Sequence, residues 1–325
     1  MSDVVRLGRE AAWTLAHGAC RRAGASEAMA RSLADAIVAA EWVGRPSVGL
    51  AHLRDYLAGF TSGRIATNVE PELDDPALAI IRSDAKGGIA QLGFDRAFQE
   101  LCSRAGRYGL AVFAQRNSYT TGELGYYVRR LAEQGLVAIA ASNGPALMAA
   151  ALGSEAVYCT NPLAFAAPVA GEPPLVIDQA SSATAFVNVR KAAEKGETIP
   201  EGWAIDAQGQ PTTDAREAVK GALLAFGGAR GGNIALMVEV LAAGISGANW
   251  SLDAPRFMTG EKSPGTGLFV LALKPDLLEP DFADRLKKQL ERLSGKGVHI
   301  PGRGRAGEAI DVPKAVIEAL ERHGR

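Results

Sequence analysis

The sequence predicts an α/β protein in which a layered α/β/α domain of non-Rossmann type follows a helical N-terminal part. Three observations support this class. Residues 3–62 carry Ala-rich helical spacing, short apolar strands alternate with helices from about residue 76, and no G-x-G-x-x-G motif joins a strand to a helix. We expect a helical part at 1–75, a cofactor-binding domain at 76–275, and a C-terminal helical segment at 276–325 that packs back on the first part.

Three helices are expected in the N-terminal part. The first covers 11–22, and the second begins at Ser26 and stops at a Gly-Pro boundary near residue 45, where glycine and proline are typical end signals. Ser47 has the right side chain to cap the third helix. One face of that helix carries Leu50, Leu53, Tyr56 and Leu57.

The central part is expected to alternate strands and helices, which favours a layered arrangement. The expected strands are the apolar runs 77–82, 109–115, 136–142, 163–168, 175–179 and 268–273. The expected helices are 95–108, 122–134, 229–243, 281–294 and 313–323.

Composition limits the classes of function. The chain has 325 residues and a formal net charge of −1, which argues against a nucleic-acid or anionic-membrane binder. No apolar run approaches the ~20 residues of a membrane span, and the charged N-terminus lacks a signal core, so we expect a cytoplasmic protein. Three scattered cysteines and four histidines predict no metal site. The chemistry must therefore come from an organic cofactor or from side chains.

Residues 175–206 are the most informative stretch. An apolar strand ends at Asp178, small hydroxyl residues follow it, and the stretch closes on the turn I-P-E-G-W-A-I-D. Small residues after a strand let the backbone approach a ligand, and an Asp at a strand end can hold a ribose or an amide. This region is the predicted ligand site.

Five motifs and a late turn occur in an order that resembles the malate/L-lactate dehydrogenase-like family of NAD(P)-dependent oxidoreductases. The resemblance spans about residues 41–304. The motifs are GRPSVGL at 44–50 followed by Tyr56, NSYTTG at 117–122, CTNP at 159–162, the 175–206 block, the glycine-rich 227–239 stretch, and the turn IPG at 300–302.

The resemblance implies a nicotinamide nucleotide site, with NADPH as the preferred donor and NADH as the alternative. It implies contacts from Thr120, Thr121, Gly122, Glu123, Leu124, Asp178, Gln179, Ala180, Arg230 and Gly231, and phosphate contacts from Gly302, Arg303, Gly304 and Arg305. An arginine can pair with a phosphate through two hydrogen bonds. A helix opening near Thr121 would also offer free amides to a phosphate. The alternative is that Arg230 and Arg303 are solvated surface charges.

The chain departs from the family at its proton relay. By resemblance, Ser47 is kept, but Val48 stands at the position of the catalytic His, Asn188 at that of its Asp partner, and His52 at that of a substrate-binding Arg. The His of the second motif is Thr120. Loss of both relay partners is expected if the reaction no longer needs them.

Reduction of a protonated cyclic imine needs no such relay. Hydride transfer to a ketone leaves an alkoxide that must be protonated, whereas a protonated imine becomes a neutral amine. We therefore expect the branch that reduces Δ1-pyrroline-2-carboxylate or Δ1-piperideine-2-carboxylate to L-proline or L-pipecolate. Ring size, cofactor preference and direction in the cell stay open. The rivals are a 2-hydroxy acid dehydrogenase of the malate or lactate type, and a non-catalytic nucleotide-binding relative.

The catalytic residues implied are Ser47, His52 and Asn188. Ser47 would bind the substrate carboxylate or the imine N–H, His52 would bind the carboxylate as an imidazolium, and Thr160 would hold the substrate with its hydroxyl. His52 lies one helical turn beyond Val48 and could alternatively donate a proton, or be a surface residue. The expected partners are a small cyclic imino acid and a second copy of the chain in a homodimer, since the family completes its site at a subunit interface.

Overall fold

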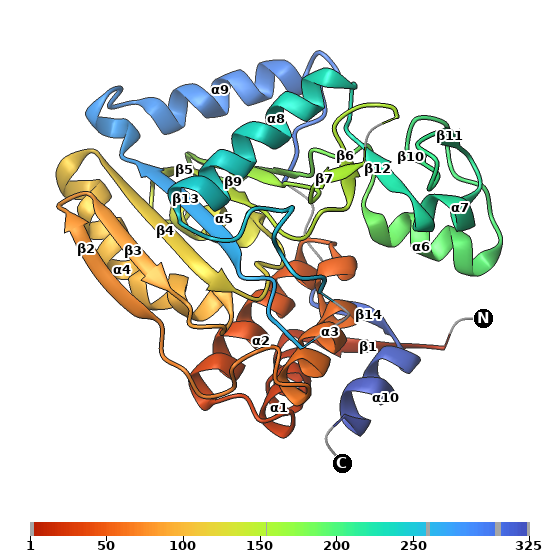
Figure 1. The fold of residues 1–325 in the computed structure, drawn as a ribbon. Helices are drawn as coiled ribbons and strands as arrows, with labels where there is room; N and C mark the ends of the chain where they lie inside the picture. Colours follow the sequence, from red (N-terminus) through yellow and green to blue (C-terminus); the bar gives the residue numbers. More distant parts are fainter. Residues whose placement is uncertain (1–2, 154, 258–260, 303–306, 324–325) are drawn as a thin grey trace.

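A seven-stranded sheet forms the centre of the protein (Figure 1). The computed structural model describes residues 3–153, 155–257, 261–302 and 307–323. Its strands are β2 (Glu72–Ala77), β3 (Ile80–Asp84), β4 (Leu110–Ser118), β5 (Val137–Ser142), β8 (Leu163–Val169), β9 (Glu172–Gln179) and β13 (Thr266–Leu273). Their order is β2-β3-β4-β13-β5-β8-β9. The β3–β4 pair is parallel and the other neighbouring pairs are antiparallel.

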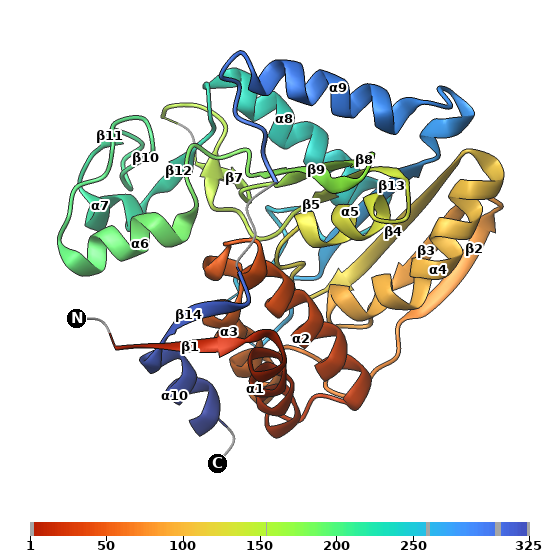
Figure 2. The same cartoon turned by 180° about the vertical axis from the view of Figure 1, so that it is seen from behind.

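Helices cover both faces of this sheet (Figure 2). On one face lie α4 (Ala90–Tyr108) and α5 (Gly125–Ala132), which share a buried apolar cluster with the strands. On the other lie α8 (Ala229–Glu239), the π-helix Val240–Ile245 that continues it, and α9 (Phe282–Ser294). The predicted α/β/α class is confirmed.

The middle of the sheet is buried from both sides. Strand β13 has the sequence TGLFVLAL, and its first five residues are all buried, as expected for a continuous apolar run. Gly93 of α4 explains how closely a helix approaches the sheet, because a Cβ atom there would lie 1.6 Å from Gln115 Oε1 of β4. The same oxygen accepts a hydrogen bond from Ser83 Oγ at 2.8 Å. A glycine is therefore required at this position.

A small lobe stands beside the main sheet and contains a five-stranded sheet with the order β11-β10-β12-β6-β7 (Figure 1). Its elements are β6 (Met148–Ala149), β7 (Ala156–Tyr158), α6 (Phe186–Lys195), β10 (Ala204–Ile205), β11 (Pro211–Thr212), α7 (Ala215–Lys220) and β12 (Ala222–Leu224). Strands of two or three residues are too short to produce a readable periodicity, so none of these strands is among the predicted elements.

The C-terminal residues pack on the N-terminal part. It consists of β1 (Val4–Gly8), α1 (Arg9–Arg22), α2 (Glu27–Trp42), the 3₁₀ turn Pro46–Val48 and α3 (Leu50–Thr61). Strand β14 (Ala309–Pro313) pairs antiparallel with β1, and α10 (Lys314–Arg322) packs on α1 and α3. The expected return of the C-terminal segment is therefore confirmed for these residues, whereas α9 lies on the main sheet. The division at residues 75 and 275 stays a prediction.

Several predicted bounds are wrong. Residues 4–8 form a strand and not a helix, because β14, distant in sequence, supplies their hydrogen-bond partners. The predicted strand 77–82 begins at Ile80, after a hairpin from β2, an exposed acidic strand without apolar alternation. The helix predicted at 122–134 begins at Gly125, and the one predicted at 229–243 changes to π geometry at Val240.

Ser26 caps α2 as predicted, accepting a hydrogen bond from the Met29 amide at 3.3 Å. Within the described ranges, no helix is long and apolar enough to cross a membrane.

Candidate active site

The segment 120–124, between β4 and α5, is fixed through its carbonyl groups. Thr120 O accepts a hydrogen bond from Tyr56 Oη at 3.3 Å, and Thr121 O accepts from Gln91 Nε2 at 3.1 Å and from Tyr127 Oη at 2.7 Å. Burial raises the pKa of Tyr56 and of Tyr127, so both hydroxyls stay protonated and can donate. The carbonyls thus face the protein interior.

The amides of residues 121–124, unlike the carbonyls, have no hydrogen-bond partner within the described part of the chain. In the part of the chain that the structure describes, the backbone N–H groups of residues 121–124 donate to no protein acceptor. The side chains of Thr121 and Glu123 are engaged internally, with Ser142 Oγ at 3.1 Å and with Arg129 at 2.6 Å. A run of free amides on a fixed backbone suits a ligand that carries phosphate or amide acceptors.

Asp178 ends β9 and joins it to α5. Its side chain is 8% exposed and accepts a hydrogen bond from the Gly125 amide at 2.8 Å. The helix start predicted near Thr121 is therefore wrong, because α5 begins at Gly125 and Asp178 occupies that amide. The phosphate contact of the 121–124 amides stays a prediction. Burial raises the pKa of Asp178, although Arg45 and the Gly125 N–H favour its charged form.

Arg45 connects this strand end to the turn that holds Ser47. Its Nη2 donates to Asp178 O at 2.8 Å, and its Nη1 lies 4.0 Å from Asp178 Oδ2. Arg45 is not among the predicted site residues, although it stands two residues before Ser47 in the first motif. The first and fourth motifs are therefore neighbours in space.

Ser47 and Val48 lie in the 3₁₀ turn before α3, with Ser47 exposed and Val48 half-buried. Ser47 does not cap α3, because the N-cap is Gly49 and the first amide, that of Leu50, donates to Glu41 Oε1 at 2.7 Å. A Cβ atom on Gly49 would lie 2.4 Å from that oxygen. The capping interpretation of Ser47 is therefore wrong, and its hydroxyl is not used by the helix.

His52 is half-buried on α3 and makes a hydrogen bond through Nδ1 to Asp55 Oδ2 at 2.9 Å. Its ring meets the buried Tyr56 ring edge-on, with centroids 5.2 Å apart. Because Tyr56 also bonds Thr120 O, the helix of His52 is tied to the 120–124 segment.

Thr160 is half-buried beside β9, where its carbonyl accepts from the Ser181 amide at 2.8 Å. The next residue, Asn161, is fully buried and donates to Glu239 Oε2 at 2.7 Å. Glu239 in turn accepts from the Ser251 amide at 2.6 Å. This buried network fixes the CTNP motif against α8, at the point where the helix becomes a π-helix, a feature common at functional sites.

Asn188 lies in the first turn of α6, is exposed, and donates to Thr184 Oγ1 at 3.1 Å. Two residues further along, the positive charge of Arg190 helps to lower the pKa of Asp55.

The other predicted cofactor residues lie at the end of β9 or just after it, on α8 and in the late turn. Gln179 is exposed and Ala180 half-buried, Arg230 is exposed in the first turn of α8, and Gly231 is buried beneath it. Gly302 is required by close approach, since a Cβ atom there would lie 2.7 Å from both Val176 N and Val176 O. Arg303, Gly304 and Arg305 lie outside the described residues.

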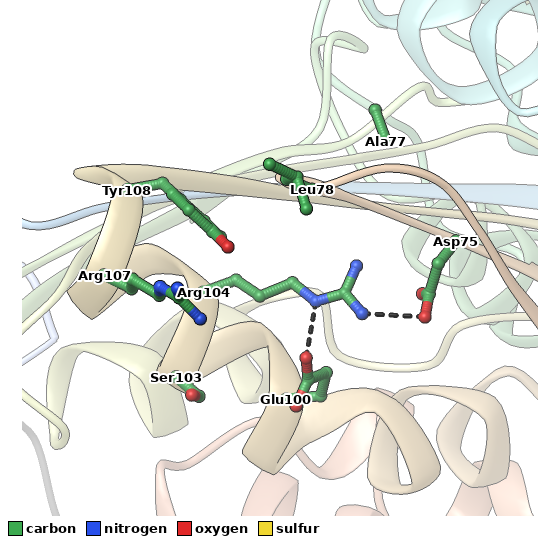
Figure 3. A pocket seen from close by; sticks show the side chains of 8 residues that line it. All are labelled: Asp75, Ala77, Leu78, Glu100, Ser103, Arg104, Arg107 and Tyr108. Carbon is green, nitrogen blue, oxygen red and sulfur yellow. Dashed lines mark hydrogen bonds and ion pairs between the residues drawn. The ribbon is translucent and has the colours of Figure 1, made fainter.

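Two surface cavities lie elsewhere. One of about 380 Å³, between α4 and the β2–β3 hairpin, contains Arg104, which is paired with Glu100 and Asp75 (Figure 3). Another of about 500 Å³ lies at residues 132–135 and 168–174. Neither is lined by a predicted site residue. Among the described residues, no cluster of three His, Cys, Asp or Glu side chains could hold a metal ion.

Comparison with known proteins identifies the family. Residues 9–314 match the malate/L-lactate dehydrogenase family. A (2R)-3-sulfolactate dehydrogenase (NADP(+)) from Chromohalobacter salexigens is 37% identical, with 98% of each chain covered. A Δ1-pyrroline-2-carboxylate/Δ1-piperideine-2-carboxylate reductase from Pseudomonas putida is 36% identical, covering 94% of this chain and 91% of the relative. The crystal structure of Δ1-piperideine-2-carboxylate reductase from Pseudomonas syringae pvar. tomato superposes with a TM-score of 0.92 at 32% identity, covering 98% and 99%.

The chain therefore belongs to the malate/L-lactate dehydrogenase family of NAD(P)-dependent oxidoreductases that act on small molecules. The predicted family and enzyme class are confirmed, and two of these three relatives carry the names of the predicted branch.

Proposed function

We propose that this protein reduces a cyclic ketimine carboxylate, Δ1-pyrroline-2-carboxylate or Δ1-piperideine-2-carboxylate or both, to L-proline or L-pipecolate, with NADPH as the hydride donor. The observation that carries the proposal is the pair of relay positions, where Val48 and Asn188 replace a His and an Asp. The names of the Pseudomonas relatives support the same substrate class.

The chemistry of the imine explains why this site can work without the relay. Ketone reduction develops negative charge on oxygen, and a positioned acid typically contributes about 10²–10⁴-fold to such a step. A protonated ketimine starts with a positive charge on nitrogen, and hydride transfer removes that charge. An apolar Val48 beside the reacting carbon therefore removes nothing that the reaction needs.

The cofactor fits the backbone of this chain. The free amides of residues 121–124 would bind its acceptor groups, and Asp178, Gln179 and Ala180 would line it at the end of β9. Arg230 and Gly231 would face its phosphates, and by the resemblance Gly302, Arg303, Gly304 and Arg305 would contact its phosphate end. When bound, NADPH supplies the hydride. The name of the Chromohalobacter relative supports the choice of NADPH over NADH.

The substrate would lie against α3 and the CTNP loop. His52, as an imidazolium, would bind the carboxylate, while Ser47 and Thr160 would orient the ring through their hydroxyls. Asn188, a neutral side chain facing this region from the small lobe, would no longer serve as a relay acid.

A homodimer is part of the proposal. The outer surface of α8 and its π-helix exposes a row of large apolar side chains, which a second copy could bury. These are Leu236 (50% exposed), Met237 (52%), Val240 (46%) and Ile245 (56%).

The rival is a 2-hydroxy acid dehydrogenase, and one observation favours it. His52 has a carboxylate partner, Asp55, at 2.9 Å, as proton-donating histidines often do. The 2-hydroxy acid named for the Chromohalobacter relative points the same way.

One assay separates these functions. NADPH oxidation by the purified protein is followed with Δ1-pyrroline-2-carboxylate, Δ1-piperideine-2-carboxylate, pyruvate and oxaloacetate. We expect turnover with the imines and little with the oxo acids. Turnover with oxo acids alone establishes the rival, and binding of NADPH without turnover of any substrate identifies a non-catalytic relative.

A further inference from the structure

Asp55 is a second charged residue on the substrate side of α3. It lies three residues after His52, a spacing that places both side chains on one face of the helix. The distance from His52 Nδ1 to Asp55 Oδ2 is 2.9 Å, and the two side chains are 23% and 28% exposed. They form a pair that is only partly screened by solvent.

This pair determines which nitrogen of His52 is free. An ionised carboxylate can only accept a hydrogen bond, so Nδ1 must carry the proton in this contact. The Tyr56 ring packs edge-on against the imidazole and is itself held by Gln91 Nε2 at 3.1 Å. With one nitrogen bonded and the ring packed, Nε2 is left for a ligand.

The charges around Asp55 keep it ionised. Burial acts to raise the pKa of Asp55, but the hydrogen bond from His52 and the charges of His52, Arg190 and Arg54 outweigh it and lower the pKa. An anion at hydrogen-bond distance stabilises positive charge on the imidazole.

We infer that Asp55 is a positioning residue for substrate binding: through the Nδ1 hydrogen bond it fixes the orientation of His52, so that Nε2 is left to bind the carboxylate of the substrate. The inference rests on the proposed function for the identity of the substrate. It also explains how a histidine can replace the arginine implied at position 52. A guanidinium is always charged and carries its own fork of donors, whereas an imidazole needs a partner to fix both charge and orientation.

The inference predicts an effect opposite to simple electrostatics. Removing the negative charge of Asp55 makes the surroundings more positive, which alone would tighten the binding of an anionic substrate. If Asp55 positions His52, its removal weakens that binding instead. The sign of the change in KM therefore distinguishes the two.

The test combines Asp55→Asn and His52→Arg in a double-mutant cycle. We expect Asp55→Asn to raise KM for the ketimine about tenfold, the scale of one charged hydrogen bond, with kcat within about twofold. In the His52→Arg background the same change should leave KM within about twofold, because arginine needs no partner. Inhibition constants of L-proline and L-pipecolate, which carry the same carboxylate, should follow KM.

Glu27→Gln is the matched control, since Glu27 pairs with His17 Nε2 at 3.1 Å away from the site, and it should leave KM unchanged. A fall in KM for Asp55→Asn, a loss confined to kcat, or an equal rise in the His52→Arg background overturns the inference. If the wild-type protein reduces oxo acids and not imines, the proposed function fails separately. The same cycle with the oxo acid, also a carboxylate, then decides the role of Asp55.

Discussion

The two sides of the candidate site are held in place in different ways. On the proposed cofactor side, buried side chains bind the carbonyls of Thr120 and Thr121, and the amides of residues 121–124 donate to no acceptor in the described part of the chain. On the proposed substrate side, the 3₁₀ turn and α3 present exposed and half-buried side chains, with a hydrogen bond between His52 and Asp55. The proposed cofactor side therefore depends on where the backbone lies, whereas the proposed substrate side depends on which side chains are present.

The difference explains where this chain can depart from its family. Thr120 stands at a histidine position on the cofactor side, where the structure uses its carbonyl and hence requires no particular side chain. Val48 and His52 change side chains on the side that we propose for the substrate. We infer that changes on the substrate side alter the reaction, whereas changes on the cofactor side alter stability and cofactor affinity.

The carboxylates of the two sides also differ. The pKa of Asp178 is raised, mainly by burial, whereas that of Asp55 is lowered by His52 and nearby cations despite burial. Asp55 therefore contributes stability above its unfolded pKa of about 3.9, and this is lost as pH falls through its folded pKa. Asp178 has the opposite effect: it favours the fold at low pH and opposes it as pH rises through its folded pKa.

The largest effect is expected on the cofactor side. Gln91→Leu removes two buried hydrogen bonds, to Tyr56 Oη and to Thr121 O, and should lower the free energy of unfolding by about 3 kcal/mol. The dissociation constant of NADPH should rise in the same variant. Urea unfolding and fluorescence titration measure the two quantities. Tyr127→Phe, which removes one bond to the same carbonyl, should cost about 1 kcal/mol. Equal stability of Gln91→Leu and wild type would refute the account of this side.

Sequence reasoning reached this architecture unevenly, for physical reasons. The long buried strands and helices carry their periodicity within themselves, so β13 and α9 were predictable. Strand β2, with the sequence ELDDPA, owes its extended form to tertiary partners, chiefly β3, and carries no apolar pattern of its own. Gln91 contacts the 120–124 segment through a tertiary hydrogen bond that no local spacing indicates. Asp55 could have been predicted from the sequence, since it lies about one helical turn from His52. It does not belong to the family's relay positions, on which the site prediction depends.

His52→Ala tests the substrate side with a somewhat smaller effect. Loss of the carboxylate anchor should raise KM for the ketimine about thirtyfold, or about 2 kcal/mol, with kcat nearly unchanged. Steady-state kinetics under saturating NADPH measure both constants. A fall in kcat of about a hundredfold or more with KM unchanged would instead identify His52 as a proton donor.

Asp178→Asn is expected to have the smallest effect on the free energy of unfolding. The difference between variant and wild type should depend on pH. The amide oxygen can still accept from the Gly125 N–H without a buried charge. At about pH 3, where the wild-type carboxyl is protonated, the two proteins should be equally stable; at neutral pH the variant should be more stable by about 1 kcal/mol or less. Its NADPH affinity should fall. Urea unfolding at the two pH values would contradict the assignment if the variant were the less stable protein at neutral pH.

The central claim is that the substrate brings the proton that the missing relay would supply. Its most direct test is to restore the histidine with Val48→His, alone and with Asn188→Asp, and to compare kcat for Δ1-pyrroline-2-carboxylate and for pyruvate. We predict that kcat for the imine does not rise, while turnover of pyruvate increases about tenfold or more because an acid is now present. An increase in imine turnover equal to that of pyruvate would contradict the claim.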